Sequence, residues 1–392
     1  MNSTAEFDVV IYGATGFTGR LVAEYMNTSY GVGKDVNWAM AGRSLDKLKA
    51  VRDEMGIAKS VDLIVADASD PASLQAMVKS TRCVLTTVGP YQLYGTALVE
   101  ACATHGTDYV DLCGEVAWMH DMIAAYEDKA KKSGARIVFS CGFDSIPFDL
   151  GVLFLQNETM RQFSAPAIRV KGRMRAMAGT FSGGTAASGR ETMARAMREP
   201  AVMAVLRNPF SLAGGFEGPE QPHGMSVQED EDFGSWAAPF IMATINTKNI
   251  HRSNALLGHP YGSDFVYDEM MLTGPGDAGK AAAEMVAKSD PMGGDDAPKP
   301  GEGPSKAERE AGHYDFALLG ITKNGDRIRA TVTGDKDPGY GSTSKMIAES
   351  AICLVKDCTD LAGGIYTPAS AMGLTLADRL QANAGLTFSI DK

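Results

Sequence analysis

The sequence predicts an α/β protein with a doubly wound parallel sheet, followed by a second α+β domain with a mostly antiparallel sheet. Up to about residue 150, short apolar runs alternate with helix-like segments, and a glycine-rich turn follows the first run. Later, one long stretch alternates apolar with basic residues. At roughly 150 residues per domain, we expect domains at 1–150 and 151–343, followed by a C-terminal helical segment, 344–392.

The expected first sheet consists of six apolar runs: FDVVIYGA, VNWAMAGR, VDLIVADA, CVLTTVG, YVDLCG and RIVFSCG. Such runs are typical of strands that are buried on both faces. The segments between them have helical spacing, as at Leu45, Leu48 and Met55, and Ser44 stands where a helix cap belongs. Alternation of strand and helix predicts right-handed crossovers and a parallel sheet covered by helices on both faces.

The second half of the chain has a different pattern. The stretch AIRVKGRMRAMAGTFSGG has the period of a half-exposed strand, and SGGT, at 182–185, predicts a turn after it. Residues 288–312 are rich in proline, glycine and charge, which predicts a long mobile loop. Helix-like runs follow near 344–356 and 369–384.

Charge and composition exclude several classes of function. Acidic residues (48) outnumber basic ones (37), and a net charge of -11 argues against a nucleic-acid partner. Six cysteines without a C-x-x-C pair are typical of free thiols in a reducing compartment, so we expect a cytoplasmic protein. Signal peptide, membrane span, metal-ligand cluster and hydrolase motif are all missing from the sequence, although contact with a membrane surface stays open.

A phosphate-binding turn is predicted directly after the first strand. Its residues are Gly13, Ala14, Thr15, Gly16, Phe17, Thr18 and Gly19, with G-x-x-G-x-x-G spacing. Gly13 allows the tight turn, Gly16 lets a pyrophosphate approach the backbone, and Gly19 lets the helix pack close to the strand. The start of the helix then points free N–H groups at the anion. Since a strand precedes the turn and a helix follows it, we expect a dinucleotide here rather than a purely structural turn.

The end of the second strand indicates which dinucleotide binds. Arg43 and Ser44 stand where an NAD-binding protein usually has an acidic residue for the ribose hydroxyl. A guanidinium makes charge-assisted contacts to a 2'-phosphate, which favours NADP(H). The alternative is an exposed arginine at a helix start. Asp67 ends the third strand, where it contacts the adenine side or caps the next helix.

The fourth strand ends in Thr87, Val88, Gly89 and Pro90, at the carboxyl edge where ligands bind in such sheets. We expect Gly89 and Pro90 to make room for the nicotinamide. Tyr91 and Tyr94 follow at once and either line that pocket or pack the next helix.

Several motifs together resemble one known family. They are GATGFTG, AGRS, TTVGPYQLYG, YVDLCGE, CGFDSIPFDLG, SGGTAASGRET, INTKNIHRSNALL, PGEGPS and YTPASAMG, and they cover most of the chain. The set resembles the saccharopine dehydrogenase-like NADP-binding oxidoreductases, particularly the branch of the trans-acting enoyl reductases of lipid and polyketide assembly. The resemblance implies a Rossmann domain, a second α+β domain that carries the substrate, and a C-terminal return to the first domain.

We therefore expect an NADP(H)-dependent oxidoreductase that reduces an activated C=C bond of a lipid-like acyl substrate. Two alternatives are a saccharopine-type amino-acid or imine dehydrogenase and a non-catalytic NADP-binding protein of lipid surfaces. The partner is a small molecule or an acyl group. Delivery of that group on a carrier and assembly as a homodimer stay open.

The candidate catalytic residues lie at the expected carboxyl edge of the first sheet. The favoured set is Tyr91, Glu115 and Asp144, beside Tyr94, Cys113 and Ser145. An enolate formed by hydride addition needs an electrostatic stabiliser and a proton. Glu115 could act as a proton donor if burial raises its pKa, and the alternative is that it caps a helix. Asp144 has the same two alternatives, a proton donor or a cap of the helix that begins near Pro147.

Four basic residues, Arg169, Lys171, Arg173 and Arg175, share one face of the long strand. Either they form a solvated face paired with acids, or they receive the phosphate of a phosphopantetheine group or an acidic carrier protein. The 21 methionines suit an ordinary core and also an adaptable apolar pocket.

Overall fold

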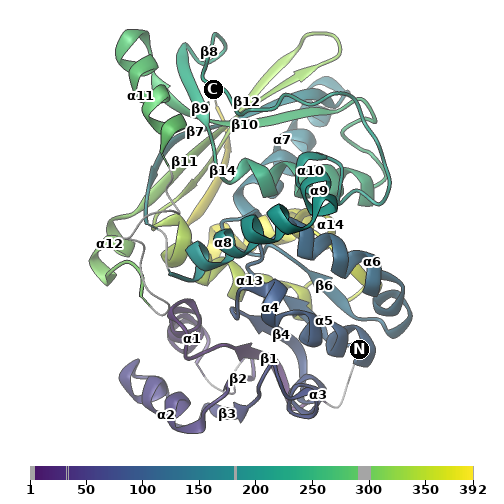
Figure 1. The fold of residues 1–392 in the computed structure, drawn as a ribbon, viewed down its shortest axis with the longest axis vertical. Coiled ribbons are helices and arrows are strands. Elements are labelled where there is room, and N and C mark those ends of the chain that lie inside the picture. The colour runs from purple at the N-terminus through teal and green to yellow at the C-terminus, as the bar shows by residue number, and fades with distance from the viewer. Residues whose placement is uncertain (1–4, 32, 34, 181–182, 290–301, 392) are drawn as a thin grey trace.

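The computed structural model describes residues 5–31, 33, 35–180, 183–289 and 302–391. Two sheets of seven strands each form the frame of this part of the chain. Figure 1 shows the first sheet in the lower half of the molecule and the second in the upper half, with helices between them. This confirms the predicted fold class.

The first sheet is parallel throughout, in the order β13-β6-β5-β4-β1-β2-β3. Its strands are β1 (Phe7–Tyr12), β2 (Trp38–Gly42), β3 (Asp62–Val65), β4 (Thr81–Thr86), β5 (Asp108–Val110), β6 (Arg136–Val138) and β13 (Gly364–Tyr366). The strand order reverses between β1 and β4, and ligands bind such sheets at the carboxyl edge beside that reversal.

Both faces of this sheet are buried along its central strands, as their apolar runs predict, whereas the edge strand β3 is only partly buried and Val65 is 51% exposed. Val9 and Ile11 of β1 pack in one core, and Val10 and Tyr12 pack in the other. The first core is closed by α1 (Phe17–Ser29), α2 (Leu45–Glu54) and α13 (Thr343–Lys356). The second is closed by α3 (Pro71–Ser80), α5 (Thr96–His105) and α6 (Val116–Ser133). The short helix α4 (Tyr91–Tyr94) follows β4.

The second sheet has the order β14-β12-β11-β7-β10-β9-β8. Its strands are β7 (Ala167–Ala178), β8 (Gln228–Asp230), β9 (Ser235–Pro239), β10 (Val266–Gly274), β11 (His313–Thr322), β12 (Arg327–Gly334) and β14 (Leu386–Ile390). Only the pair β7 and β10 is parallel among these described strands. Helix α7 (Ile146–Phe163) packs on this sheet and extends the first core into the second half of the molecule.

The remaining helices lie between and around the two sheets. They are α8 (Gly183–Arg198), α9 (Pro200–Arg207), α10 (Ala243–Leu256), α11 (Gly276–Lys288), α12 (Lys306–Ala311), the π-helical turn η1 (Pro338–Ser342) and α14 (Pro368–Asn383). In Figure 1, α8 crosses the middle of the molecule between the two sheets.

The C-terminal segment differs from the helical one that we predicted. Its helices α13 and α14 lie where the apolar spacing placed them, but it also contributes one strand to each sheet. The strand β13 extends the first sheet beyond β6, and β14 pairs with β12 at the edge of the second. The last residues therefore tie the two halves of the chain together.

Two local predictions from the second half are wrong. SGGT forms no turn within the sheet, because α8 begins at Gly183 in this motif. The predicted loop 288–312 contains the helix α12, whose start is fixed by a capping box between Ser305 and Glu308. Residues 290–301 of that loop lie outside the described part of the chain.

In the described ranges, no helix is long and apolar enough to cross a membrane. All six cysteines are free thiols, and the sulfurs of Cys353 and Cys358 lie 3.8 Å apart. The described residues contain no group of three or more His, Cys, Asp or Glu side chains suited to a metal ion.

Candidate functional site

The glycine-rich turn closes tightly over the end of β1. Gly13 has a φ of +92°, and a Cβ on it would lie 2.7 Å from a methyl group of Val88. A Cβ on Gly19 would lie 2.1 Å from the carbonyl oxygen of Gly13, so only glycine lets α1 pack this close to β1. Gly16 is exposed and caps α1, whose first N–H groups have no acceptor within the helix. This cradle fits the diphosphate of a dinucleotide.

The other residues of the turn have more varied surroundings. Thr15 and Thr18 are half-buried, and the Thr15 carbonyl accepts a hydrogen bond from Arg20 Nε at 3.3 Å. The ring of Phe17 packs edge-on against Tyr340, 5.2 Å between centroids, and lies beneath the Arg309 guanidinium. Phe17 therefore connects the turn to α12, through Arg309, and to η1, through Tyr340.

Arg43 is exposed beyond the end of β2, where we predict that it contacts a 2'-phosphate. The Ser44 hydroxyl instead accepts the Lys47 N–H at 3.4 Å and caps α2. Asp67 accepts hydrogen bonds from the backbone and hydroxyl of Ser69, which, together with the charge of Arg43, lower its pKa. Arg43 is the cationic side chain of the three, and it lies close enough to Asp67 for its charge to act on that carboxylate.

We expect Arg43→Ala to weaken NADPH binding by about 1–3 kcal/mol, the range for a lost charge-assisted contact. NADH binding should change little, because NADH lacks the 2'-phosphate. Calorimetric titration of both nucleotides measures this, with the exposed Arg207→Ala at the end of α9 as the charge-matched control. Equal weakening of NADPH and NADH would reject this role for Arg43.

The segment after β4 lies directly against the glycine turn. The backbone N–H of Thr87 donates to the Tyr12 carbonyl at 3.0 Å, and the Thr87 hydroxyl lies 3.4 Å from the Gly13 carbonyl. Gly89 is exposed, and a Cβ on it would lie 3.6 Å from the hydroxyl of Ser188 in α8. Residues 87–90 therefore form the wall between the turn and α8, where we predict the nicotinamide.

Tyr91 and Glu115 hold this wall in place. The Glu115 carboxylate is buried and accepts the N–H groups of Tyr91 and Gln92 at 2.8 and 2.9 Å. The buried Tyr91 hydroxyl accepts the Leu112 N–H at 3.0 Å and donates to the Thr86 carbonyl. These contacts favour positioning roles for both residues. Their assignment as proton donors stays a prediction.

Asp144 has a different environment. It follows β6 and is half-buried, and its Oδ1 is enclosed without a hydrogen-bond partner among the described residues. Burial raises the pKa of this carboxyl to about 7. A Cβ on Gly114 would lie 3.6 Å from Asp144 Oδ2, which places the carboxyl beside the end of β5. A carboxyl with this pKa can hold and release a proton near neutral pH.

Residues of the second domain complete a cluster around Asp144. The amide of Asn249 on α10 donates to the Ser145 hydroxyl at 2.8 Å. One turn earlier, the Asn246 amide donates to Glu269 Oε2 of β10 at 2.9 Å. Burial, and to a smaller degree the charge of Asp144, raise the pKa of Glu269 to about 8. We call Asp144, Ser145, Asn246, Asn249 and Glu269 the polar cluster.

The three members from the second domain, Asn246, Asn249 and Glu269, were not predicted from the sequence. A usable signal was present on α10, because Asn246, Asn249 and Ser253 recur at helical spacing inside an otherwise mixed segment. All three side chains are buried. A buried polar stripe on one helix face indicates partners across an interface.

Two other catalytic candidates, Cys113 and Tyr94, differ in burial. Cys113 is fully buried, which raises the pKa of its thiol well above the usual range. Tyr94 is 46% exposed at the end of α4.

The basic face of β7 already has acidic partners. Arg169 pairs with Asp268, Lys171 with Asp230 and Asp232, Arg173 with Asp230 and Asp268, and Arg175 with Asp315. These pairs agree with the interpretation of the four residues as a face paired with acids. Arg173 is only 1% exposed, so it is not solvated. The pairing argues against a patch that receives a carrier or its phosphate.

Known proteins resemble this chain over its whole length. Residues 9–138 match the family described as "Saccharopine dehydrogenase NADP binding domain". A candidate trans-acting enoyl reductase of Mycobacterium tuberculosis (strain H37Rv) is 41% identical over 98% of this chain and 97% of its own. The "Trans-acting enoyl reductase" of Mycobacterium bovis (strain BCG) is 38% identical over 96% of each chain. The saccharopine dehydrogenase (L-Glu forming) of Saccharomyces cerevisiae has the same fold, with a TM-score of 0.56 at 12% identity, covering 98% of this chain and 100% of its own.

Proposed function

This chain belongs to the trans-acting enoyl reductase family with a saccharopine dehydrogenase-type NADP-binding domain, and from that premise we propose that it reduces an activated C=C bond of an acyl substrate. It is an NADP-dependent oxidoreductase. The observation that carries the finer proposal is the enclosed, unpartnered carboxyl of Asp144 beside the expected nicotinamide wall.

Bound NADPH would supply a hydride to the β-carbon of the double bond. The electron pair of that bond then moves toward the carbonyl oxygen, and the α-carbon needs a proton. We assign this proton to Asp144, because its pKa of about 7 leaves a large protonated fraction at neutral pH. Its half-buried side chain keeps one side accessible to a substrate.

The neighbours of Asp144 support this role. Ser145 is buried and its hydroxyl accepts a hydrogen bond from the amide of Asn249, and we assign its hydroxyl hydrogen to a developing oxyanion. Asn246 and Glu269, the other buried members of the polar cluster, come from the second domain and are joined by a hydrogen bond. Enclosure excludes water and strengthens the electrostatic interactions with the reacting atoms.

A groove next to this wall offers both apolar and charged side chains to an acyl substrate. Its volume is about 340 Å³ between α4, α6 and α8, and Leu93, Trp118 and Met122 line it beside the charged Asp121, Glu191, Arg195 and Arg198. The Gln92 amide donates to Thr192 at 3.3 Å, which brings α8 against α4. Exposed apolar side chains flank this contact, with Leu93 at 54% and Met193 at 51% exposure. A flexible methionine surface can accommodate chains of different shape.

A saccharopine-type substrate would need free arginines for its carboxylates. The basic side chains of β7 are balanced by aspartates, so this face offers no such site.

The test is NADPH oxidation, followed by absorbance, across a panel of enoyl thioesters and of saccharopine-pathway intermediates. We expect turnover with enoyl thioesters, increasing with apolar chain length. Turnover with the amino-acid substrates alone would overturn the proposal, as would NADPH binding without oxidation of any thioester.

A further inference from the structure

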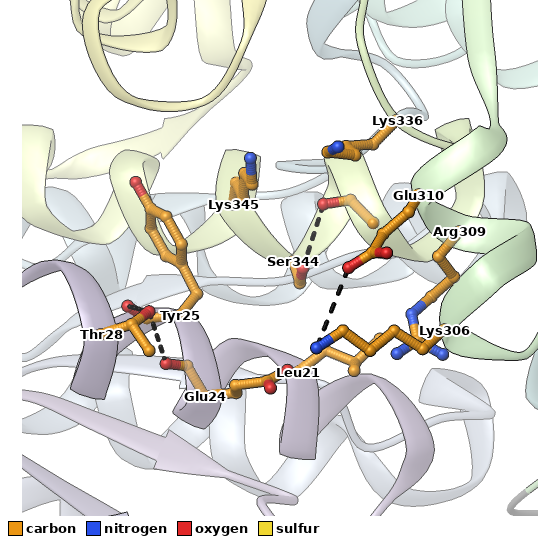
Figure 2. Close-up of a pocket in the computed structure, with 11 residues that line it drawn as sticks. Leu21, Glu24, Tyr25, Thr28, Lys306, Arg309, Glu310, Lys336, Ser344 and Lys345 are labelled. Atoms are coloured by element: carbon orange, nitrogen blue, oxygen red, sulfur yellow. Dashed lines mark hydrogen bonds and ion pairs between the residues drawn. The ribbon is translucent and has the colours of Figure 1, made fainter.

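A second cleft lies behind the dinucleotide turn, between α1, α12 and the start of α13. Its volume is about 240 Å³. Figure 2 shows that its side chains come from α1 below, from α12 at the right and from the segment 336–345 above. The lining residues of α1 run from Leu21 to Thr28, one to three turns beyond the helix start at Phe17. The cleft is therefore separate from the diphosphate cradle.

The cleft is positively charged on an acidic protein. Four cationic side chains line it: Lys306, Arg309, Lys336 and Lys345. The anionic side chains of the lining are Glu24 and Glu310. The whole chain carries a net charge of -11, so a local excess of cations is unusual for this molecule.

Two of the four cations already have partners. The Lys306 ammonium lies 3.9 Å from a carboxylate oxygen of Glu310. The Arg309 guanidinium donates a hydrogen bond to the Pro304 carbonyl at 2.6 Å and lies over the ring of Phe17. Asp337 lies behind the cleft, and its carboxylate accepts hydrogen bonds from the Tyr340 and Gly341 N–H groups. Burial raises the pKa of Asp337, and the charge of Arg309 partly offsets that rise.

Lys336 and Lys345 are different. Both are half-buried, and in the ranges that the structure describes no carboxylate lies within 4.0 Å of either ammonium group. A partly desolvated ammonium without a counter-charge is unfavourable, and a bound anion would relieve that cost.

We propose that this cleft binds a phosphate group, held chiefly by Lys336 and Lys345 with Lys306 and Arg309 at its side. Tetrahedral phosphate offers several acceptor oxygens, so it can take hydrogen bonds from two ammonium groups at once. Leu21 of α1 provides an apolar wall for the rest of a phosphorylated molecule. The site is independent of the proposed reduction.

The experiment measures thermal stability of the full chain with saturating NADPH, which occupies the dinucleotide cradle. Inorganic phosphate is titrated against chloride at constant ionic strength, because screening alone also changes stability. We expect phosphate to raise the melting temperature. Lys336→Gln/Lys345→Gln should weaken phosphate binding about tenfold or more, as the loss of two charge-assisted contacts implies, and should leave NADPH affinity unchanged.

The control is Lys132→Gln/Lys323→Gln, which removes the same charge from two exposed lysines outside the lining of the cleft. It should keep the phosphate effect. Absence of any phosphate effect beyond chloride, or an equal effect in both double variants, would overturn the proposal.

Two further probes distinguish a soluble phosphorylated ligand from a lipid headgroup. Glycerol 3-phosphate tests a soluble ligand, and co-sedimentation with phosphatidic acid vesicles, compared with phosphatidylcholine, tests a lipid headgroup. Binding of either probe that is lost in Lys336→Gln/Lys345→Gln supports the site and names its source. Binding of both probes that the variant does not reduce would contradict it.

Discussion

Replacing Asp144 by asparagine is expected to lower kcat for enoyl reduction by about 10²–10⁴-fold, the usual contribution of a general acid. Asparagine keeps the shape of the side chain but has no transferable proton. NADPH affinity should stay near that of the unchanged protein, because the glycine cradle and Arg43 do not contact Asp144 in the described structure. Steady-state kinetics with the best thioester of the panel and nucleotide titration together measure the two effects.

The same assignment fixes the sign of the pH dependence. Burial raises the pKa of Asp144 to about 7, so the acid form dominates below pH 7 and disappears as pH rises. The rate should therefore be highest on the acidic side and fall through about pH 7. Asp144→Asn should lose this fall and leave a small, flatter rate.

Asp149 provides a matched control five residues further along the chain. Burial also raises the pKa of Asp149 to about 7, but its carboxylate accepts hydrogen bonds from Ser253 and the Ala369 N–H. Asp149→Asn should lower the free energy of unfolding by about 1–3 kcal/mol through these lost bonds and keep the pH profile of kcat. A fall near pH 7 that survives in Asp144→Asn would remove Asp144 from the reaction.

The first sheet could be predicted from the sequence because its signals are local. Each of the six apolar runs overlaps one of the strands from β1 to β6, and the glycine spacing identifies the turn. The strand β13, Gly364–Tyr366, was missed because, unlike β5 and β6, it does not lie in a longer apolar run, so only pairing with β6 defines it. SGGT was read as a turn because glycine disfavours helices. Contacts such as the Thr185 hydroxyl to Tyr340, 3.1 Å, hold α8 in place despite its glycines.

The cofactor half of the site follows from the same local signals, and the polar cluster does not. Asp144 was found because it follows an apolar strand at the expected edge. Asn246 and Glu269 come from the second domain, and the packing of α10 against β10 and α7 that places them depends on tertiary structure. Nothing in the sequence near Glu269 indicates that its carboxyl would be buried with a pKa near 8.

The largest effect on stability is expected at Arg173. Its guanidinium is 1% exposed and pairs with Asp230 at 2.6 Å and with Asp268 at 2.8 Å. Arg173→Met keeps most of the volume but leaves two buried carboxylates without this partner. Breaking a buried ion pair on one side costs about 3–5 kcal/mol. Urea unfolding followed by circular dichroism should show this loss as a lower midpoint.

Arg175→Met, two residues along the same strand, is the matched control. Arg175 and Asp315 are 37% and 34% exposed, and such surface pairs contribute about 0–1 kcal/mol. If β7 is a structural ion-pair face, the two variants should differ by several kcal/mol in stability, and Arg175→Met should keep full activity on carrier-bound and free thioesters. A selective loss of activity toward carrier-bound thioesters in Arg175→Met would instead identify this face as a docking surface. If Arg173→Met lowers the free energy of unfolding only slightly, then Lys171 and Arg169 alone are enough to neutralise Asp230 and Asp268.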